Sequence, residues 1–287
     1  MAKYSFVVLH YNSIDDTNDC VSSITSHCSD VDYRIYIVDN ASPNGSGLVL
    51  AARYDADKRI RIILSEKNLG FAKGNNLGIA QAREDGYADF VIVINNDIKV
   101  IEDDFCRLIE SSYNRNAFAV LGPTIYTPRG KTAINPGRGY VLREGELDLW
   151  ESFYKKGLTL IKSNQFFRFK LLQKVMRFKI RLKSLRKPKF KYTENCVLHG
   201  CCLIFSSEYF KNFNGFDDRT FLYFEEEILY AHVMSAGLKT VYDPSIKIWH
   251  KEDGATDSVF GDNLSKTVFV YENIIDSIQV YKKIASK

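Results

Sequence analysis

Short apolar runs alternate with longer polar segments along the first half of the chain. The runs are rich in Val and Ile and cover residues 5–9, 34–38, 60–64, 90–94 and 118–122. The segments between them carry apolar residues at helical spacing. This order predicts a βαβα series, and therefore an α/β fold with a mostly parallel, Rossmann-like sheet covered by helices on both faces.

Polar residues follow directly after four of these runs. In such sheets, ligands bind beyond the carboxyl ends of the strands. Asn and Asp are also common in turns and at helix N-caps, so a single polar strand end would indicate little. Four at one edge indicate a site that contacts a base, a ribose or a phosphate. They are His10, Tyr11 and Asn12, then Asp39 and Asn40, then residues 65–68, and finally Asn95, Asn96 and Asp97.

Three glycines, Gly70, Gly74 and Gly78, stand four residues apart after the third run. Their spacing differs from that of the dinucleotide-binding and Walker phosphate loops. On a helix it places the glycines on one face, where the backbone can approach a neighbour closely. We expect Gly74 and Gly78 to pack against the sheet. Asn68, Gly70 and Lys73, at the loop and first turn, are the candidates for contact with an anionic ligand.

A basic segment spans residues 155–191, which contain fourteen Lys or Arg and no acid. The net charge is only +4, so the rest of the chain carries 25 basic and 35 acidic residues. A stripe of apolar residues predicts an amphipathic helix ending at Pro188, although residues 178–183 also alternate like a strand. Such a helix either docks on an anionic membrane or packs its stripe on the domain. The stripe consists of Phe167, Leu171, Val175, Phe178, Leu182 and Leu185.

The composition is that of an ordinary globular protein, with 45% hydrophobic and 26% charged residues. This excludes a disordered, collagen-like or disulfide-scaffold protein. The chain has neither an apolar run long enough to span a membrane nor a secretory signal at its N-terminus, so we expect a cytoplasmic location. Six cysteines without a CxxC pair predict reduced, buried thiols.

Acidic residues at two places are candidates for catalysis. Asp97 follows the most apolar run and is placed to hold Mg²⁺ or Mn²⁺ against a diphosphate, although a capped turn would give the same tripeptide. The glutamates at 225–227 follow an aromatic run, where burial and mutual repulsion raise the pKa of a carboxyl and suit it to act as a general base. His250 ends a strand-like run and is either a structural residue or a metal ligand.

These motifs resemble those of the family 2 nucleotide-sugar glycosyltransferases with the GT-A fold, in particular their bacterial rhamnosyltransferase-like and galactofuranosyltransferase-like branch. The resemblance implies inverting, metal-dependent transfer of a sugar to a lipid-linked or oligosaccharide acceptor in bacterial surface polysaccharide assembly. It runs in the family's order from residue 4 to about residue 255 and omits most of 130–192. Segments 7–12, 38–42, 68–78, 95–97, 200–205, 215–229 and 249–250 carry it.

The resemblance also implies roles for individual residues. Asn95 stands where the family often has Asp, which leaves metal dependence open, and Ile228 replaces a further acid, which keeps Glu225 a candidate beside Glu226. The implied donor-binding residues are Tyr11, Asn12, Asp39, Asn68, Gly70, Lys73, Asn95 and Asn96; the metal ligands are Asp97 and His250; the catalytic acids are Glu226, as general base, and Glu225; and the acceptor-binding residues are Gly200, Cys201 and Tyr223.

The expected organisation has four parts. Residues 1–125 form a nucleotide-sugar-binding half, 126–192 a variable loop and basic insertion, 193–255 the acceptor and catalytic half of the same domain, and 256–287 a helical tail. The tail either caps the acceptor side or pairs subunits. The expected partners are a UDP or dTDP sugar of rhamnose, galactose or galactofuranose type, Mn²⁺ or Mg²⁺, and the inner membrane face as a docking surface for residues 155–191.

Two other classes of protein compete with this interpretation. A nucleotidyltransferase on a similar sheet would consume a nucleoside triphosphate, but the acids after the aromatic run favour a transferase base. A nucleic-acid-binding protein would use residues 155–191 and bind any duplex in a salt-sensitive way. The chain shows no recognised nucleic-acid module and its remainder is acidic, so we expect no nucleic-acid partner.

Overall fold

The computed structural model describes residues 2–131, 134–184, 190–251 and 263–285. Leu185 and Pro188 of the basic segment, the turn expected at 252–254 and residues 256–262 of the expected tail lie outside these ranges. Within them, none of the helices combines the length and the apolar character needed to cross a bilayer.

The described strands form one ten-stranded sheet. They are β1 (Lys3–His10), β2 (Asp32–Asp39), β3 (Ile60–Leu64), β4 (Phe90–Asn95), β5 (Ile98–Val100), β6 (Val120–Thr127), β7 (Gly130–Lys131), β8 (Thr193–Glu194), β9 (Cys202–Ser206) and β10 (Thr240–His250). Their order is β3-β2-β1-β4-β9-β6-β10-β5, with β7 beside β6 and β8 beside β10. The first four are parallel, as predicted. β9 runs antiparallel between β4 and β6, because the long segment from β6 to β9 leaves and re-enters the sheet at the same edge.

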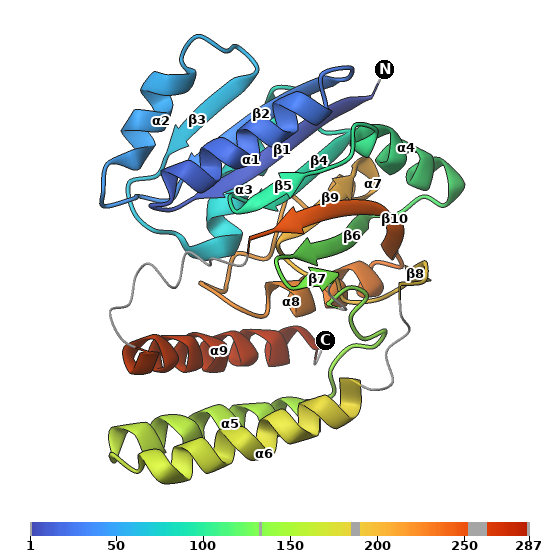
Figure 1. Cartoon of the computed structure of the whole chain (residues 1–287). Coiled ribbons are helices and arrows are strands. Elements are labelled where there is room, and N and C mark those ends of the chain that lie inside the picture. The colour runs from blue at the N-terminus through green and yellow to red at the C-terminus, as the bar shows by residue number, and fades with distance from the viewer. Residues whose placement is uncertain (1, 132–133, 185–189, 252–262, 286–287) are drawn as a thin grey trace.

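Helices cover both faces of the sheet (Figure 1). They are α1 (Ile14–His27), α2 (Ser46–Tyr54), α3 (Gly70–Glu84), α4 (Phe105–Arg115), α5 (Glu144–Lys162), α6 (Phe166–Ser184), α7 (Ser207–Phe210), α8 (Glu225–Ser235) and α9 (Asn263–Ala285). Ile24 and Phe105 belong to the core that joins α1, α2 and α4 to one face. Ile79 and Val233 belong to the core that joins α3, α7 and α8 to the other.

The strand register aligns the polar strand ends. His10 lies opposite Asp39, and Leu9 lies opposite Asn95. The carboxyl ends of β1, β2 and β4 therefore meet at one edge of the sheet, on the left in Figure 1, as the sequence predicts. This edge carries the candidate site.

α3 approaches β1 closely through two glycines. A Cβ atom at Gly74 would lie 2.7 Å from Leu9 Cδ1, and one at Gly78 would lie 2.5 Å from Val7 Cγ1. Both contacts confirm the tight packing of helix on sheet that the spacing predicts.

α9 lies between α8 and the hairpin of α5 and α6 (Figure 1). Its residues Ile274, Ile278 and Tyr281 are buried in a cluster with Leu147 of α5 and Ile228 of α8. This apolar stripe is covered within the chain, so it is not the surface that would pair subunits.

The region from 123 to 150 is more regular than its Gly and Pro content indicates. β6 continues to Thr127, and α5 begins at Glu144, where the Arg143 N–H donates to Glu146 Oε2 (3.3 Å). The apolar partner of α5 is α9, more than a hundred residues later in the chain. The spacing of apolar residues within α5 therefore gives little indication of this helix.

α6 is helical through residues 178–183, where a strand was the alternative. Phe169 is buried in a cluster with Leu160 and Tyr271. Phe167, Leu171 and Val175 are instead 82%, 54% and 49% exposed. These three residues do not pack on the domain, so that interpretation of the stripe is wrong for them.

All six cysteines are buried and unbridged, as predicted. The Sγ atoms of Cys28 and Cys106 lie 3.7 Å apart, well beyond disulfide-bond length. Burial raises the pKa of the Cys196 thiol to about 12. The thiol of Cys196 is therefore protonated at neutral pH.

Candidate active site

Asp39 is fixed at the end of β2 by the turn that follows it. Its carboxylate accepts hydrogen bonds from the Ser42 N–H (3.2 Å) and the Ser42 hydroxyl. Gly47 of α2 packs directly on it, because a Cβ atom there would lie 2.1 Å from Asp39 Oδ2. The fold thus holds a buried carboxylate at the edge where the resemblance implies contact with the nucleotide base.

His10 is fully buried beneath this edge and connects three segments. Its Nδ1 lies 2.7 Å from Thr17 Oγ1, and its Nε2 lies 2.7 Å from Ser46 Oγ. Asn96 Nδ2 donates to the same Thr17 hydroxyl (3.1 Å). Burial lowers the pKa of His10, so the ring acts as a neutral hydrogen-bonding group between α1, α2 and the strand end at Asn96.

Tyr11 and Asn12 follow at the same edge, and both are half-buried. Asn12 has a left-handed φ of 63°, and its N–H donates to Ser42 Oγ (2.9 Å). Its Oδ1 is buried without a hydrogen-bond partner among the described residues. Buried polar atoms are normally paired, so this oxygen is well suited to contact a ligand.

Asn40 organises the turn into α3. Its Oδ1 accepts from the Leu69 N–H (2.8 Å), and its Nδ2 donates to Asn68 Oδ1 (3.0 Å), which also accepts from the Gly70 N–H (2.9 Å). The Asn68 side chain thus shapes the loop, and its contact with the donor stays a prediction. Lys73 is exposed on the first turn of α3 and has no ion-pair partner within the part of the chain that the structure describes.

Gly70 brings the start of α3 against the acidic segment. Its φ is 77°, and a Cβ atom there would lie 2.0 Å from the Phe221 carbonyl oxygen. The Phe71 N–H donates to the same oxygen (2.9 Å). Phe221 precedes Glu225 by four residues, so the predicted donor loop and the predicted catalytic acids belong to one site.

Asp97 and His250 are neighbours although 153 residues separate them. His250 Nε2 lies 3.1 Å from Asp97 Oδ2. Pairing of β10 with β5 sets His250 opposite Ile98, next to Asp97. His250 Nδ1 is buried without a partner among the described residues. The structure thus brings together the two side chains that the resemblance implies as metal ligands.

The side chains near Asp97 fit a cation that also takes ligands from substrate. Asn95 continues β4 and its N–H donates to the Cys201 carbonyl (2.9 Å), while the Asn96 amide is turned into α1. Within the described ranges, no three His, Cys, Asp or Glu side chains surround one point. The carboxylate of Asp97 and the imidazole of His250 therefore suit Mg²⁺ or Mn²⁺, which keep waters and phosphate oxygens as ligands, rather than an enclosed zinc ion.

Two residues with left-handed backbone precede α8. Tyr223 and Phe224 have φ values of 72° and 68°, which non-glycine residues rarely adopt. Phe224 is held by ring contacts with Trp150 and Tyr281. The turn places the glutamates at 225–227 on the first turn of α8, where the helix dipole favours negative charge.

Glu226 is oriented by a backbone amide. The Gly200 N–H donates to its Oε1 (3.0 Å). Burial raises the pKa of Glu226, while this hydrogen bond and the Arg138 guanidinium act in the opposite direction. The charges of Asp97 and Glu226 both add to burial in raising the pKa of the Cys201 thiol. Cys201 follows Gly200, and its carbonyl accepts from the Asn95 N–H (2.9 Å), so it lies between the predicted base and the strand end that leads to Asp97.

The two neighbouring glutamates differ from Glu226. Burial, and then repulsion by Glu226, raises the pKa of Glu225 to about 8, so Glu225 is mostly protonated at neutral pH. Its Oε1 accepts a long hydrogen bond from the Thr220 hydroxyl (3.4 Å). Glu227 Oε1 forms an ion pair with Arg138 Nη2 (3.1 Å). This arrangement leaves Glu226, rather than Glu225, as the acid available to take a proton.

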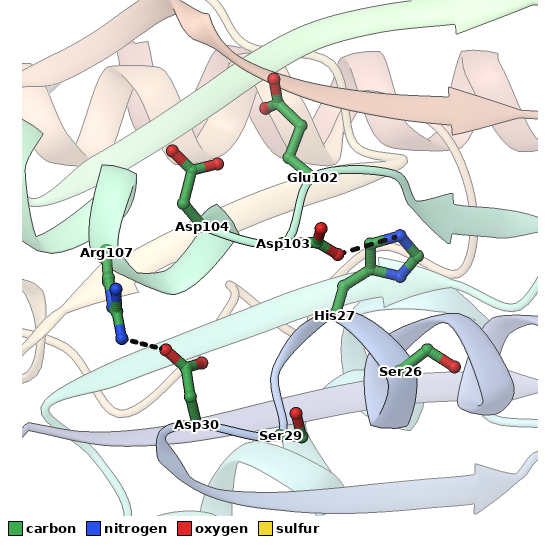
Figure 2. Close-up of a pocket in the computed structure, with 8 residues that line it drawn as sticks. All are labelled: Ser26, His27, Ser29, Asp30, Glu102, Asp103, Asp104 and Arg107. Atoms are coloured by element: carbon green, nitrogen blue, oxygen red, sulfur yellow. Dashed lines mark ion pairs between the residues drawn. The ribbon is translucent and has the colours of Figure 1, made fainter.

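A separate pocket of about 530 Å³ lies between the end of α1 and the start of α4 (Figure 2). Its charged side chains form ion pairs within the fold, namely His27 with Asp103 (3.7 Å) and Arg107 with Asp30. α1 runs back across the sheet, so this pocket is at the edge opposite the carboxyl ends of β1 and β4. It is not part of the candidate site.

Comparison with known families gives the chain its relatives. A family model described as glycosyl transferase family 2 matches residues 5–213. The chain belongs to this family. The match covers β1 to β9, with the edge formed by the carboxyl ends of β1, β2 and β4, and it ends before the acids of α8. The family predicted from the motifs is confirmed.

Individual relatives are distant in sequence. N-acetylglucosaminyl-diphospho-decaprenol L-rhamnosyltransferase of Mycobacterium tuberculosis is 25% identical over 77% of this chain and 67% of that protein. Glycosyltransferase GlyG of Streptococcus pneumoniae is 27% identical over 41% of this chain and 38% of that protein. The crystal structure of S. aureus TarS 1–349 has a TM-score of 0.54 at 12% identity, over 87% of this chain and 60% of that chain. This likeness confirms the predicted fold, and the chain spans less than two thirds of the TarS fragment.

Three residues that support the site of this family 2 enzyme were not indicated by any pattern in the sequence. Arg138, which pairs with Glu227, lies between two glycines in a segment rich in Gly and Pro. His199 Nδ1 accepts from the Cys201 N–H (3.1 Å), and its ring centroid is 6.4 Å from that of His250. Asn135 Oδ1 accepts from the His199 N–H (2.8 Å). Their partners are remote in sequence or are backbone groups, so no spacing marks them.

The raised pKa of Glu225 predicts a pH-dependent stability. The unfolded chain releases this proton near pH 4.5, whereas the folded enzyme keeps it to about pH 8. The folded state binds more protons in that window, so the free energy of unfolding falls as pH rises through it, by up to about 1.4 kcal/mol per pH unit. Glu225→Gln stays neutral, and we expect a flatter dependence in urea unfolding across the window. Equal slopes for the two proteins would contradict the assignment.

Proposed function

We propose that this family 2 glycosyltransferase moves a sugar from a nucleoside-diphosphate sugar to a hydroxyl of a lipid-linked or oligosaccharide acceptor, with inversion at the anomeric carbon. The observation that carries the proposal is the half-buried Glu226 carboxylate, which the Gly200 N–H orients next to Cys201, whose carbonyl accepts from the Asn95 N–H two residues before Asp97. One site thus combines an acid suited to take a proton with an edge suited to hold a diphosphate.

The acceptor hydroxyl is a weak nucleophile, so its proton must leave as it attacks. Glu226 takes this proton while the acceptor oxygen forms its bond to the anomeric carbon. The bond between that carbon and the diphosphate oxygen breaks on the opposite face, and the nucleoside diphosphate leaves with the electron pair. Glu225 stays protonated, and Arg138 keeps Glu227 paired, so Glu226 is the acid of the three that is left to take the proton.

Asp97 and His250 would hold Mn²⁺ or Mg²⁺. When bound, the cation supplies positive charge for the diphosphate. Lys73 and the backbone N–H groups at the start of α3 would supply further positive charge and hydrogen bonds for the diphosphate. Asp39, Tyr11 and Asn12 would contact the nucleoside.

The identity of the substrates rests on the relatives. The name of the mycobacterial relative specifies a rhamnosyl transfer to a diphospho-decaprenol acceptor. It supports a lipid-diphosphate acceptor and a rhamnosyl donor here. A UDP or dTDP donor, and galactose or galactofuranose as the other sugars, stay predictions. Gly200 and Tyr223, beside the acids, would contact the acceptor, whereas the Cys201 side chain is buried in the core and is not placed to do so. Such an acceptor resides in a membrane, so the enzyme would act at an anionic membrane surface.

A transfer assay tests the proposal. The enzyme is incubated with UDP and dTDP sugars, with and without a polyprenyl-diphosphate N-acetylglucosamine acceptor, and nucleoside diphosphate release is measured. We expect release with one donor to rise when the acceptor is added, and NMR of the product to show the inverted anomer. Retention of configuration, or release of pyrophosphate from a nucleoside triphosphate, would contradict it.

A further inference from the structure

α6 carries apolar residues on two faces. One face, with Phe169 and Leu172, packs against α5 and α9. The other, with Phe167, Leu171 and Val175, is exposed, and Phe167 is the most exposed at 82%. Exposed apolar stripes of this kind mark contact surfaces, since isolated solvated helices place polar residues outward.

The charges around this stripe have one sign. Arg168, Lys170 and Lys174 are exposed beside it, and none forms an ion pair with a described residue. No acid occurs anywhere from residue 155 to residue 191. The partner of this surface must therefore offer both negative charge and an apolar phase.

A groove of about 700 Å³ adjoins the stripe, between the first turns of α6 and of α9. Its lining is both apolar and basic and includes Phe166, Lys170, Leu264 and Lys266. Farther along α9, the ring of Phe269 is 6.4 Å from that of Phe221. Phe221 is the residue that contacts Gly70, so this end of α9 adjoins the acidic segment of the candidate site.

We propose that the exposed face of α6 and the α6–α9 groove dock on an anionic membrane surface. A second copy of the chain would bring two basic faces together, and duplex nucleic acid would offer phosphates but no apolar phase for Phe167 and Leu171. Anionic lipids supply both. In Figure 1 the turn between α5 and α6 and the start of α9 point to the same side as the carboxyl ends of β1, β2 and β4.

This inference deepens the proposed function, because a docked enzyme would meet a membrane-borne acceptor at the edge that holds Glu226. Only this link between docking and the acceptor rests on the proposed function. The docking itself is a physical property of the folded chain and is measured without substrate.

The test is sedimentation of the full chain with vesicles. We expect binding to phosphatidylcholine vesicles that contain about one third phosphatidylglycerol, little binding to pure phosphatidylcholine, and weaker binding as salt rises. The double variant Phe167→Ser, Leu171→Ser should bind at least about tenfold more weakly, because two apolar side chains no longer enter the lipid. Leu48→Ser, Val49→Ser is the matched control, since both residues are exposed on α2, and it should bind like the wild type.

Two results would overturn the inference. One is absence of binding of the wild type to the anionic vesicles. The other is equal binding by wild type and by the α6 variant, which would show that the stripe is not in contact with lipid. A salt-sensitive shift of duplex DNA without vesicle binding would assign the basic face to nucleic acid instead. Nucleoside diphosphate binding, measured on the same samples, separates failure of this inference from failure of the proposed function.

Discussion

Glu226→Gln is expected to keep its affinity for the nucleotide sugar and to lose about 10²- to 10⁴-fold in turnover. Gln preserves the size of the side chain and an oxygen that can accept from the Gly200 N–H, but it cannot take a proton from the acceptor. Glu225→Gln is the matched control. Because Glu225 is already mostly protonated at neutral pH, replacing it with a neutral amide should change turnover by less than about tenfold.

Initial rates at saturating donor, with donor affinity measured separately, distinguish these outcomes. A Glu226→Gln enzyme with normal turnover would remove Glu226 as the base. A large loss in Glu225→Gln with little loss in Glu226→Gln would move the role to the preceding residue. Loss of donor affinity in Glu226→Gln would show that the variant disturbs more than proton transfer.

Gly70→Ala is expected to lower the free energy of unfolding by about 2–5 kcal/mol and to reduce turnover strongly. Its φ of 77° disfavours a side chain by about 1–2 kcal/mol. A Cβ atom would also meet the Phe221 carbonyl at 2.0 Å, which forces a further shift of about 1–3 kcal/mol. That shift moves the segment that leads to Glu226, so activity should fall more than stability alone explains.

Gly86→Ala is the control that separates the effect of backbone strain from the effect of the contact with Phe221. Gly86 has a φ of 73°, but no neighbouring atom lies within 4 Å of the place that a Cβ atom would take, so Ala should cost only the backbone strain of about 1–2 kcal/mol and leave turnover unchanged. Urea unfolding and initial rates on both variants give the comparison. Equal effects of the two substitutions would show that the contact between Gly70 and Phe221 does not position the acids.

The polar edge at the carboxyl ends of β1, β2 and β4 was predictable, because the sequence patterns that indicate it are local. Each apolar run ends in polar residues, and parallel pairing necessarily brings those ends together, as His10 opposite Asp39 shows. The close packing of Gly74 and Gly78 likewise follows from four-residue spacing. α5 and the antiparallel β9 were not predictable in this way, because their partners are distant in sequence.

The side-chain geometry of the site was predictable only in part. The resemblance implied Asp97 and His250 as a pair, and the structure places them in contact. Neither the sequence pattern nor the family resemblance indicated that Arg138 pairs with Glu227. Neither indicated that His10 joins two helices beneath the carboxyl ends of β1 and β2. Such contacts depend on how loops and helix ends meet in space, which one sequence does not encode in any regular spacing.

The carboxyl edge of the sheet is expected to bind a nucleoside diphosphate through a cation held at Asp97, and the proposed transfer depends on this binding. Calorimetric titration with UDP, dTDP and GDP, each with Mn²⁺, with Mg²⁺ and with EDTA, tests it directly. Asp97→Ala is the test variant, and Asp103→Ala, an exposed carboxylate at the opposite edge, is the control.

We expect one diphosphate to bind with a divalent cation, and EDTA or Asp97→Ala to weaken that binding by at least about tenfold, while Asp103→Ala leaves it unchanged. Binding of no diphosphate under any condition, or equal binding by the wild type and Asp97→Ala in EDTA and in metal, would contradict the claim.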